Sequence, residues 1–126
     1  MNELRITENF SFWSDRKILC SCCQRVKIDD LFFDHMDLLQ RLRMECGPLV
    51  VNSGYSCPEY NASVGGAENS MHLEFATDIR PVGGLLDDCA EAAQDFGFTG
   101  IGRYETFVHL DRRDLIGRTP AQWDAR

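Results

Sequence analysis

The sequence contains no long hydrophobic run, and none of its apolar stretches approaches the roughly 18 residues that a membrane-spanning helix requires. Positive charge is also scarce, because 13 lysines and arginines stand against 20 aspartates and glutamates, for a formal net charge of -7. Proteins that bind nucleic acids draw their affinity from basic patches. We therefore expect neither a membrane-embedded segment nor a nucleic-acid partner.

Features of a multidomain or exported protein are missing as well. The 126 residues hold no internal repeat, no low-complexity segment and no interdomain linker. This length predicts one domain over residues 1–126, and we expect a monomer. The start, M-N-E-L-R-I-T-E-N-F, lacks a charged stretch followed by an apolar one, so it predicts no secretory signal and synthesis in the cytoplasm.

The six cysteines lack a second pair at the distance of a zinc ribbon. Three of them, Cys20, Cys22 and Cys23, lie close together and raise the hypothesis of a structural zinc site. The missing secretory signal indicates a reducing compartment, which argues against disulfides. Buried free thiols, which pack as small hydrophobic side chains, are the preferred interpretation, with a second metal site as the alternative.

Hydrophobic periodicity predicts a mixed fold. Leu31, His35, Leu38 and Leu42 follow one another at helical spacing, which makes His35 a core histidine. A polar, glycine-rich loop over 53–70 is long enough to suggest a functional role. The predicted elements are helices over 29–46 and 85–96 and strands over 48–52, 75–80, 98–103 and 105–111. Their order and short connections predict an α+β fold with a small, mainly antiparallel sheet backed by helices.

The chemistry-bearing residues are His72, Asp78 and His109. Two imidazoles and one carboxylate suit a zinc ion that keeps a fourth position open, as catalytic sites do. An extended chain would separate the Cα atoms of His72 and Asp78 by about 20 Å, so a shared metal demands a bend near Leu73 and Glu74. By periodicity alone, a loop histidine, an ion-pair partner and a solvent-facing strand residue are the alternatives.

Two runs of sequence stand out, S-G-Y-S-C-P-E-Y-N-A-S-V-G-G-A-E-N-S-M-H-L-E-F-A-T-D-I and G-I-G-R-Y-E-T-F-V-H-L-D. They resemble the M15 family of zinc D-Ala-D-Ala carboxypeptidases and related peptidoglycan endopeptidases. Members typically show S-G-Y-R-S-P-x-x-N, V-G-G-A-x-x-S-x-H and A-x-D-I, followed by a short strand with a second histidine. The resemblance covers most of the chain and is to compact members, many of them phage or prophage proteins.

This resemblance implies the family fold, a small antiparallel sheet backed by helices that is also found in the hedgehog signalling domain. It implies Zn2+ as the cofactor and a peptidoglycan stem peptide as the substrate. Either carboxypeptidase or endopeptidase activity is compatible with it. An endolysin role, with action on the cell wall after release from the cytoplasm, is a natural extension.

The resemblance also assigns roles to individual residues. It makes His72, Asp78 and His109 the zinc ligands, places Ser70 near the metal and makes Tyr55, in the S-G-Y run, a candidate for substrate binding. The base is Glu105 or Asp111, with Glu105 slightly preferred, because both share the His109 face if the strand begins at residue 105. Whichever of the two is not the base is a candidate to orient a histidine ligand.

Three departures from the family pattern are notable. Phe75 stands where a glycine is usual, the spacing from His72 to Asp78 is one residue short, and Ser56 replaces an arginine. Arg80 or Arg103 could supply the missing substrate-binding cation by position. The departures motivate an alternative function, a non-catalytic module on the same fold that binds zinc or a wall peptide.

Overall fold

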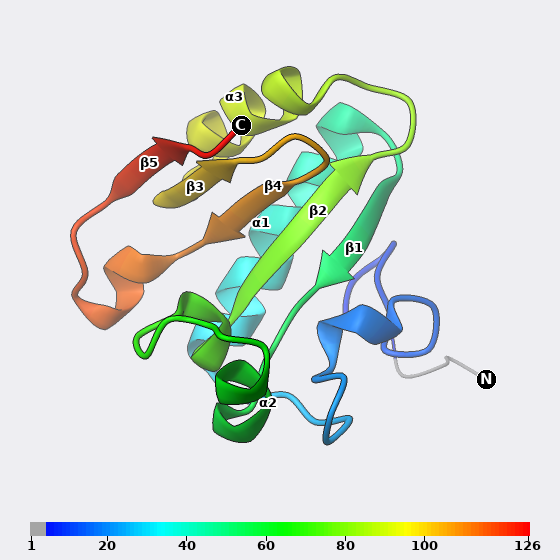
Figure 1. Ribbon diagram of the computed structural model, residues 1–126. Coiled ribbons are helices and arrows are strands. Elements are labelled where there is room, and N and C mark those ends of the chain that lie inside the picture. Colours follow the sequence, from blue (N-terminus) through cyan, green and yellow to red (C-terminus); the bar gives the residue numbers. More distant parts are fainter. Residues whose placement is uncertain (1–4) are drawn as a thin grey trace.

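The computed structural model describes residues 5–126 and contains a five-stranded sheet with strand order β1-β2-β4-β3-β5 (Figure 1). Its strands are β1 (Leu49–Ser53), β2 (Ala76–Pro81), β3 (Gly100–Arg103), β4 (Val108–Asp111) and β5 (Ala121–Asp124). The helices are α1 (Asp30–Cys46), α2 (Pro58–Ser63) and α3 (Leu86–Phe96), with 3-10 turns η1 (Arg16–Ile18), η2 (Met71–Leu73) and η3 (Arg113–Ile116). Within residues 5–126, no helix has the length and apolar character needed to cross a bilayer.

Four strands of the sheet pair antiparallel, and β5 joins the edge parallel to β3. Helices α1 and α3 lie side by side against one face of this sheet (Figure 1). The prediction of an α+β fold with a small, mainly antiparallel sheet backed by helices is therefore confirmed. The opposite face carries Asp78 and His109, which are directly paired across β2 and β4.

Helix α1 begins and ends where the sequence predicts. The Asp29 side chain caps it by accepting a hydrogen bond from the backbone N–H of Phe32 at 3.0 Å. Gly47 ends it with a φ of 79°, a conformation that glycine adopts without a steric penalty. Its apolar face is buried against the sheet, and His35 within it is fully buried, with Nε2 2.9 Å from Thr77 Oγ1.

Two predicted segments, the strand over 105–111 and the loop over 53–70, differ from the structure. The strand expected from residue 105 begins only at Val108, because residues 104–107 form a turn closed by a hydrogen bond from Tyr104 N–H to Phe107 O at 3.0 Å. Glu105 consequently lies on an exposed turn and not on the His109 face of a strand. The loop predicted over 53–70 contains α2, and the C-terminal tail, for which no element was predicted, forms β5.

The buried imidazole of His35 makes the fold sensitive to acid. Burial lowers its pKa to about 3, whereas an exposed histidine titrates near about 6.5. The unfolded chain therefore binds a proton that the folded protein excludes between these values. As the pH falls through this window, the free energy of unfolding decreases by up to about 1.4 kcal/mol per pH unit.

Replacing His35 with glutamine is expected to remove this contribution, because an amide does not titrate but still hydrogen-bonds Thr77. Urea unfolding of both proteins near pH 7 and near pH 5, with a chelator present throughout, measures the difference. The chelator ensures that metal release contributes equally to both. Identical losses of stability in the two proteins would contradict the assignment of His35 as the acid-sensitive group.

Candidate metal centre

A tight bend between η2 and β2 brings His72 and Asp78 together. The Ser70 side chain caps η2 by accepting a hydrogen bond from the backbone N–H of His72 at 3.2 Å. Glu74 then turns the chain with φ -97° and ψ -77°, and β2 begins at Ala76. The bend required near Leu73 and Glu74 is therefore present, and His72 Nε2 lies 3.3 Å from Asp78 Oδ1.

Phe75 occupies this bend without obstructing it. Its side chain is fully buried and points to the helix side of the sheet, with its ring centroid 4.8 Å from those of Phe32 and His35. The large side chain thus anchors the bend in the hydrophobic core. The shortened spacing and the missing glycine are accommodated by this packing.

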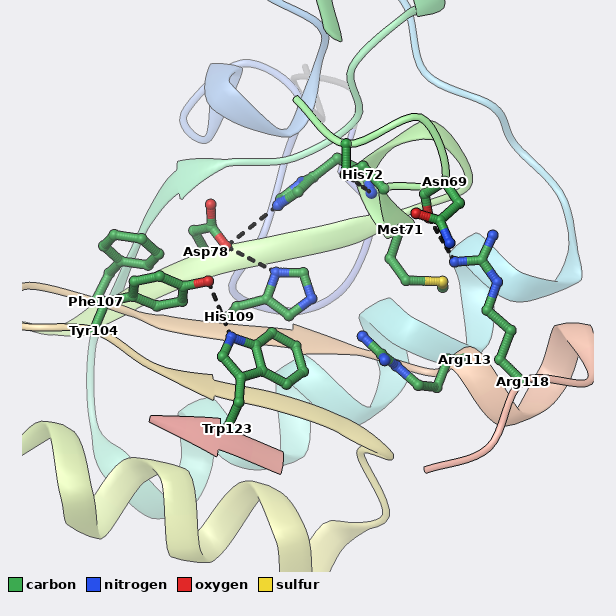
Figure 2. Close-up of a pocket in the computed structure, with 12 residues that line it drawn as sticks. Asn69, Met71, His72, Asp78, Tyr104, Phe107, His109, Arg113, Arg118 and Trp123 are labelled. Carbon is green, nitrogen blue, oxygen red and sulfur yellow. Dashed lines mark hydrogen bonds and ion pairs between the residues drawn. The ribbon is translucent and has the colours of Figure 1, made fainter. Parts of the chain in front are cut away.

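The third candidate ligand reaches the same point from the neighbouring strand. His109 Nδ1 lies 3.2 Å from Asp78 Oδ1, and the two imidazole ring centroids are 5.1 Å apart. One ligand atom from each of His72, Asp78 and His109 lies within 4.8 Å of the other two. Figure 2 shows both rings directed at the Asp78 carboxylate.

The hydrogen bonds on the far side of each ring support a metal between the three residues. His72 Nδ1 lies 2.7 Å from the carbonyl oxygen of Gly54, which can only accept, so Nδ1 carries the proton. His109 Nε2 lies 2.7 Å from Asp111 Oδ2 and donates to it. In the neutral rings, His72 Nε2 and His109 Nδ1 then present lone pairs to Asp78, an arrangement that a cation stabilises. Two nitrogens and one carboxylate oxygen are ligands that Zn2+ prefers.

Both carboxylates of the centre are held in the ionised form. Burial would raise the pKa of Asp78, but the His109 and His72 rings, when they are protonated, lower it to about 2 through hydrogen bonds and charge. Burial would also raise the pKa of Asp111, but hydrogen bonds and charge from His109 and Arg113 hold that pKa well below its usual range. Burial lowers the pKa of His109, yet Asp111 and Asp78 raise it overall. The site therefore keeps negative charge where a divalent cation needs it.

The three residues lie on the wall of an open cleft with a volume of about 550 Å³. Ser70 also lines it, and the other eight lining residues were not singled out from the sequence as site residues: Ala67, Asn69, Met71, Tyr104, Phe107, Arg113, Arg118 and Trp123. Two arginines and several aromatic rings give the cleft a cationic and apolar character within an acidic protein.

Trp123 on β5 forms one wall of this cleft. It packs over Gly102, where a Cβ atom would overlap the indole ring. Its Nε1 donates a hydrogen bond to Tyr104 Oη at 3.0 Å, and the Arg113 guanidinium lies 5.1 Å from its ring centroid (Figure 2). The alternation of apolar and polar residues in A-Q-W-D, over residues 121–124, is the sequence signal that could have found it.

Besides the three candidate ligands, two of the predicted site residues lie at the centre. Ser70 lines the cleft and caps the turn that carries His72. Asp111 is fully buried behind His109 and receives two side-chain hydrogen bonds from Arg113, at 3.0 and 2.8 Å. Gly100 leaves room for this carboxylate, since a Cβ atom there would overlap it. Asp111 thus contacts a ligand and not the open side of the centre.

The other predicted site residues do not line the cleft. Glu105 is exposed on the turn before β4, and Arg80 is exposed two residues beyond Asp78 on β2. Arg103 points to the helix side of the sheet, where its guanidinium lies 3.5 Å from Asp87. Tyr55 lines a separate cleft that also contains cysteine side chains.

The chain matches a protein-family model over most of its length. The model of the family described as Peptidase M15 matches residues 12–111. The chain belongs to the peptidase M15 family. Members of this family are zinc peptidases, in agreement with the donor set of His72, Asp78 and His109. No curated protein matches the chain. Arg113, Arg118 and Trp123 of this M15 peptidase lie beyond the matched residues.

Proposed function

We propose that this M15 peptidase hydrolyses a peptide bond in the stem peptides of bacterial peptidoglycan. The observation that carries the proposal is the convergence of His72 Nε2, Asp78 Oδ1 and His109 Nδ1 on the wall of an open cleft. Three protein ligands beside an accessible space are typical of a catalytic zinc site. A closed structural site would offer four ligands and no room for a substrate.

Each residue of the centre would have a separate role. His72, Asp78 and His109 would hold the zinc ion, which when bound supplies a Lewis acid for the scissile carbonyl and lowers the pKa of water. Asp111 acts as a positioning residue, because it accepts the Nε2 proton of His109 and keeps the Nδ1 lone pair directed at the metal position. The Gly54 carbonyl performs the same task for His72.

Tyr104 is placed to stabilise negative charge on the substrate. Its oxygen accepts the Trp123 Nε1 hydrogen, so its own hydroxyl proton remains free to donate into the cleft. We expect Tyr104→Phe to lower kcat by about 10²-fold, the usual effect of removing one donor to a developing oxyanion. Steady-state kinetics and zinc analysis should show an unchanged metal content. An unaltered kcat would remove Tyr104 from the mechanism.

Arg118 is placed to bind the carboxylate at the end of a stem peptide. Its guanidinium lines the cleft and donates to the carbonyl of Asn69 at 2.7 Å, whereas Arg113 is engaged by Asp111. A charge-assisted hydrogen bond contributes roughly 1.5–3 kcal/mol, so Arg118→Gln should raise KM by about 10- to 100-fold.

The matched control is the same peptide with its C-terminal carboxylate converted to an amide. Arg118→Gln should affect hydrolysis of the free acid much more than that of the amide, if the guanidinium recognises the carboxylate. Equal losses on both substrates would indicate that Arg118 supports the fold of the cleft instead. Comparison of kcat/KM for the four combinations isolates the pairwise term.

The proposed function is tested with purified protein, isolated sacculi and defined stem peptides, each with zinc and with a chelator. Released D-alanine identifies a carboxypeptidase, and fragments cut within the stem identify an endopeptidase. Clearing of a sacculus suspension would support the lytic role of an endolysin. Unchanged turnover after complete metal removal would reject the zinc mechanism.

One observation favours the second candidate, a non-catalytic module that binds zinc or a wall peptide. Among the described residues that line the cleft, Asp78 is the only carboxylate, and it is a proposed ligand. A base separate from the metal ligands is therefore not evident within reach of the open position. Zinc at unit stoichiometry in the centre, with no hydrolysis of any wall fragment, would favour this module.

A further inference from the structure

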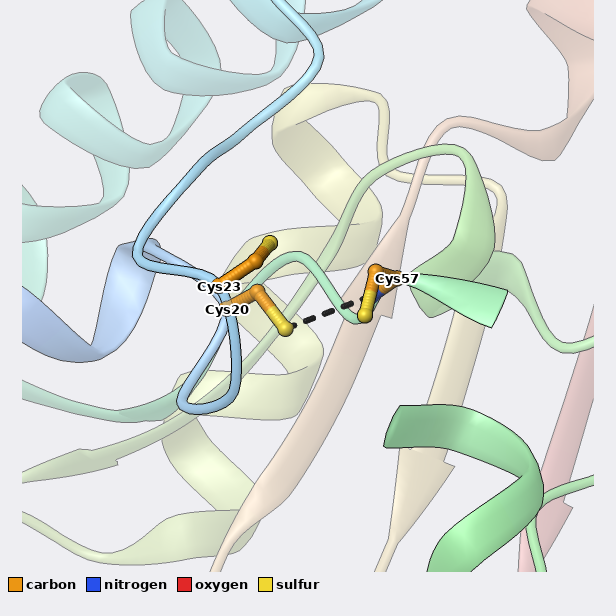
Figure 3. Close-up of side chains that lie close together, drawn as sticks. All are labelled: Cys20, Cys23 and Cys57. Atoms are coloured by element: carbon orange, nitrogen blue, oxygen red, sulfur yellow. Dashed lines mark hydrogen bonds between the residues drawn. The ribbon is translucent and has the colours of Figure 1, made fainter. Parts of the chain in front are cut away.

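A second cluster of metal-binding side chains lies outside the cleft. The sulfur atoms of Cys20, Cys23 and Cys57 lie within 4.8 Å of one another. Figure 3 shows the loop that carries Cys20 and Cys23 facing the segment that carries Cys57. Cys20 and Cys57 are 37 residues apart in the sequence, so the fold and not the local chain brings the thiols together.

The loop around Cys20 has the geometry of a metal-binding turn. Cys20 N–H donates to Arg25 O and Gln24 N–H donates to Cys20 O, both at 2.8 Å. Gln24 has a φ of 60°, the left-handed conformation that closes the turn directly after Cys23. Two residues separate Cys20 from Cys23, the spacing common to zinc ligands on such turns.

Backbone N–H groups point at the sulfur atoms of this cluster. Cys57 N–H donates to Cys20 Sγ at 3.3 Å, and Tyr60 N–H donates to Cys57 Sγ at 3.4 Å. Such donors stabilise a thiolate, the form of cysteine that binds metals.

We propose that Cys20, Cys23 and Cys57 bind a second, structural Zn2+ ion. Thiolates are soft ligands and select zinc among the common divalent ions. The Cys22 thiol and the Glu59 carboxylate line the separate cleft that Tyr55, Cys23 and Cys57 also line. They are the candidates for the fourth ligand of this zinc ion. The zinc site considered from the sequence combined Cys20, Cys22 and Cys23, whereas in the structure the third thiol of the cluster is that of Cys57, from a distant segment.

The site would act as a clamp on the segment that orients His72. Tyr55 N–H donates to Ile18 O at 2.9 Å, and Ser56 N–H donates to His72 O at 2.9 Å. Gly54 provides the carbonyl that holds His72 Nδ1. A metal at Cys57 therefore ties residues 53–57 to the N-terminal segment on one side, while those residues support His72 on the other.

The test uses the reduced full chain loaded with Co2+, in which thiolate ligands give sulfur-to-cobalt charge-transfer bands in the near ultraviolet. The His72, Asp78 and His109 centre contains no sulfur, so such bands report on the cysteine site alone. We expect the bands in the wild type and in His72→Ala. Their absence from both proteins would overturn the proposal, as would a disulfide between two of the three cysteines in protein isolated without air.

Metal analysis provides the second readout. We expect about two zinc ions per chain in the wild type, one for each site, and one fewer in Cys23→Ser. Cys23 is exposed, so serine leaves no cavity and the variant should fold. Cys46→Ser, which changes a half-buried thiol outside the cluster, is the matched control and should keep both ions. Equal zinc contents in Cys23→Ser and Cys46→Ser would contradict the site.

Discussion

Replacing His72 with alanine is expected to abolish hydrolysis and to remove the metal from the cleft. His72 supplies one of the three converging ligand atoms, 3.3 Å from Asp78 Oδ1. A metal acting as Lewis acid contributes several kcal/mol to catalysis, which corresponds to a loss of about 10³-fold or more in kcat. Zinc content and turnover of a stem peptide, measured on the same preparation, check both parts of this expectation.

The matched control is His35→Gln, which changes the buried histidine on the other face of the sheet. It should retain zinc in the cleft and most of the activity, because His35 contacts Thr77 and aromatic rings of the core. Circular dichroism and unfolding curves establish that both variants fold. Activity that persists in His72→Ala at the wild-type level would exclude this centre as the catalytic site.

Asp111→Asn is expected to have the second largest effect, through a ligand and not through direct contact with the substrate. The buried carboxylate accepts from His109 Nε2 and from Arg113, so an amide weakens both interactions. Loss of such a partner usually reduces metal affinity or activity by about 10- to 100-fold. The free energy of unfolding should fall by about 1.5–3 kcal/mol, since hydrogen bonds to a charged group are lost.

Glu105→Gln is the informative comparison, because strand parity made both Glu105 and Asp111 candidates for the base, with Glu105 slightly preferred. Glu105 is exposed on a turn outside the cleft, so we expect its variant to retain activity within about twofold, as is usual for a surface change. Zinc titration with a competing chelator and steady-state kinetics measure both variants. A larger loss in Glu105→Gln than in Asp111→Asn would assign the base to Glu105 and contradict this placement.

Elements with strong local signals were predictable. Helix α1 has apolar residues at helical spacing, a side-chain cap at Asp29 and a glycine stop at Gly47, all within a short stretch of chain. The glycine that ends α3, Gly97, has a φ of 111° and closes the helix where expected. The strands around Asp78 and His109 were also found, because their alternation is a local property.

Elements that depend on distant partners were missed. Strand β5 is short and half exposed, and it exists because β3 offers it an edge. Strand β4 begins at Val108 and not at the predicted residue 105. The Tyr104 and Phe107 rings stack with their centroids 4.4 Å apart, which favours a turn over residues 104–107. Short segments of this kind carry too little periodicity to distinguish a strand from a turn.

The sequence by itself determined the fold class and the kind of chemistry, because the three ligand candidates stand in runs that resemble a family of zinc peptidases. Tertiary structure decided which atoms meet. It turned His72 and His109 toward one oxygen of Asp78, placed Asp111 behind a ligand, and brought Cys57 to Cys20. Residue type and spacing are properties of the chain, whereas a metal site is a set of distances of a few ångströms between segments that only packing brings together.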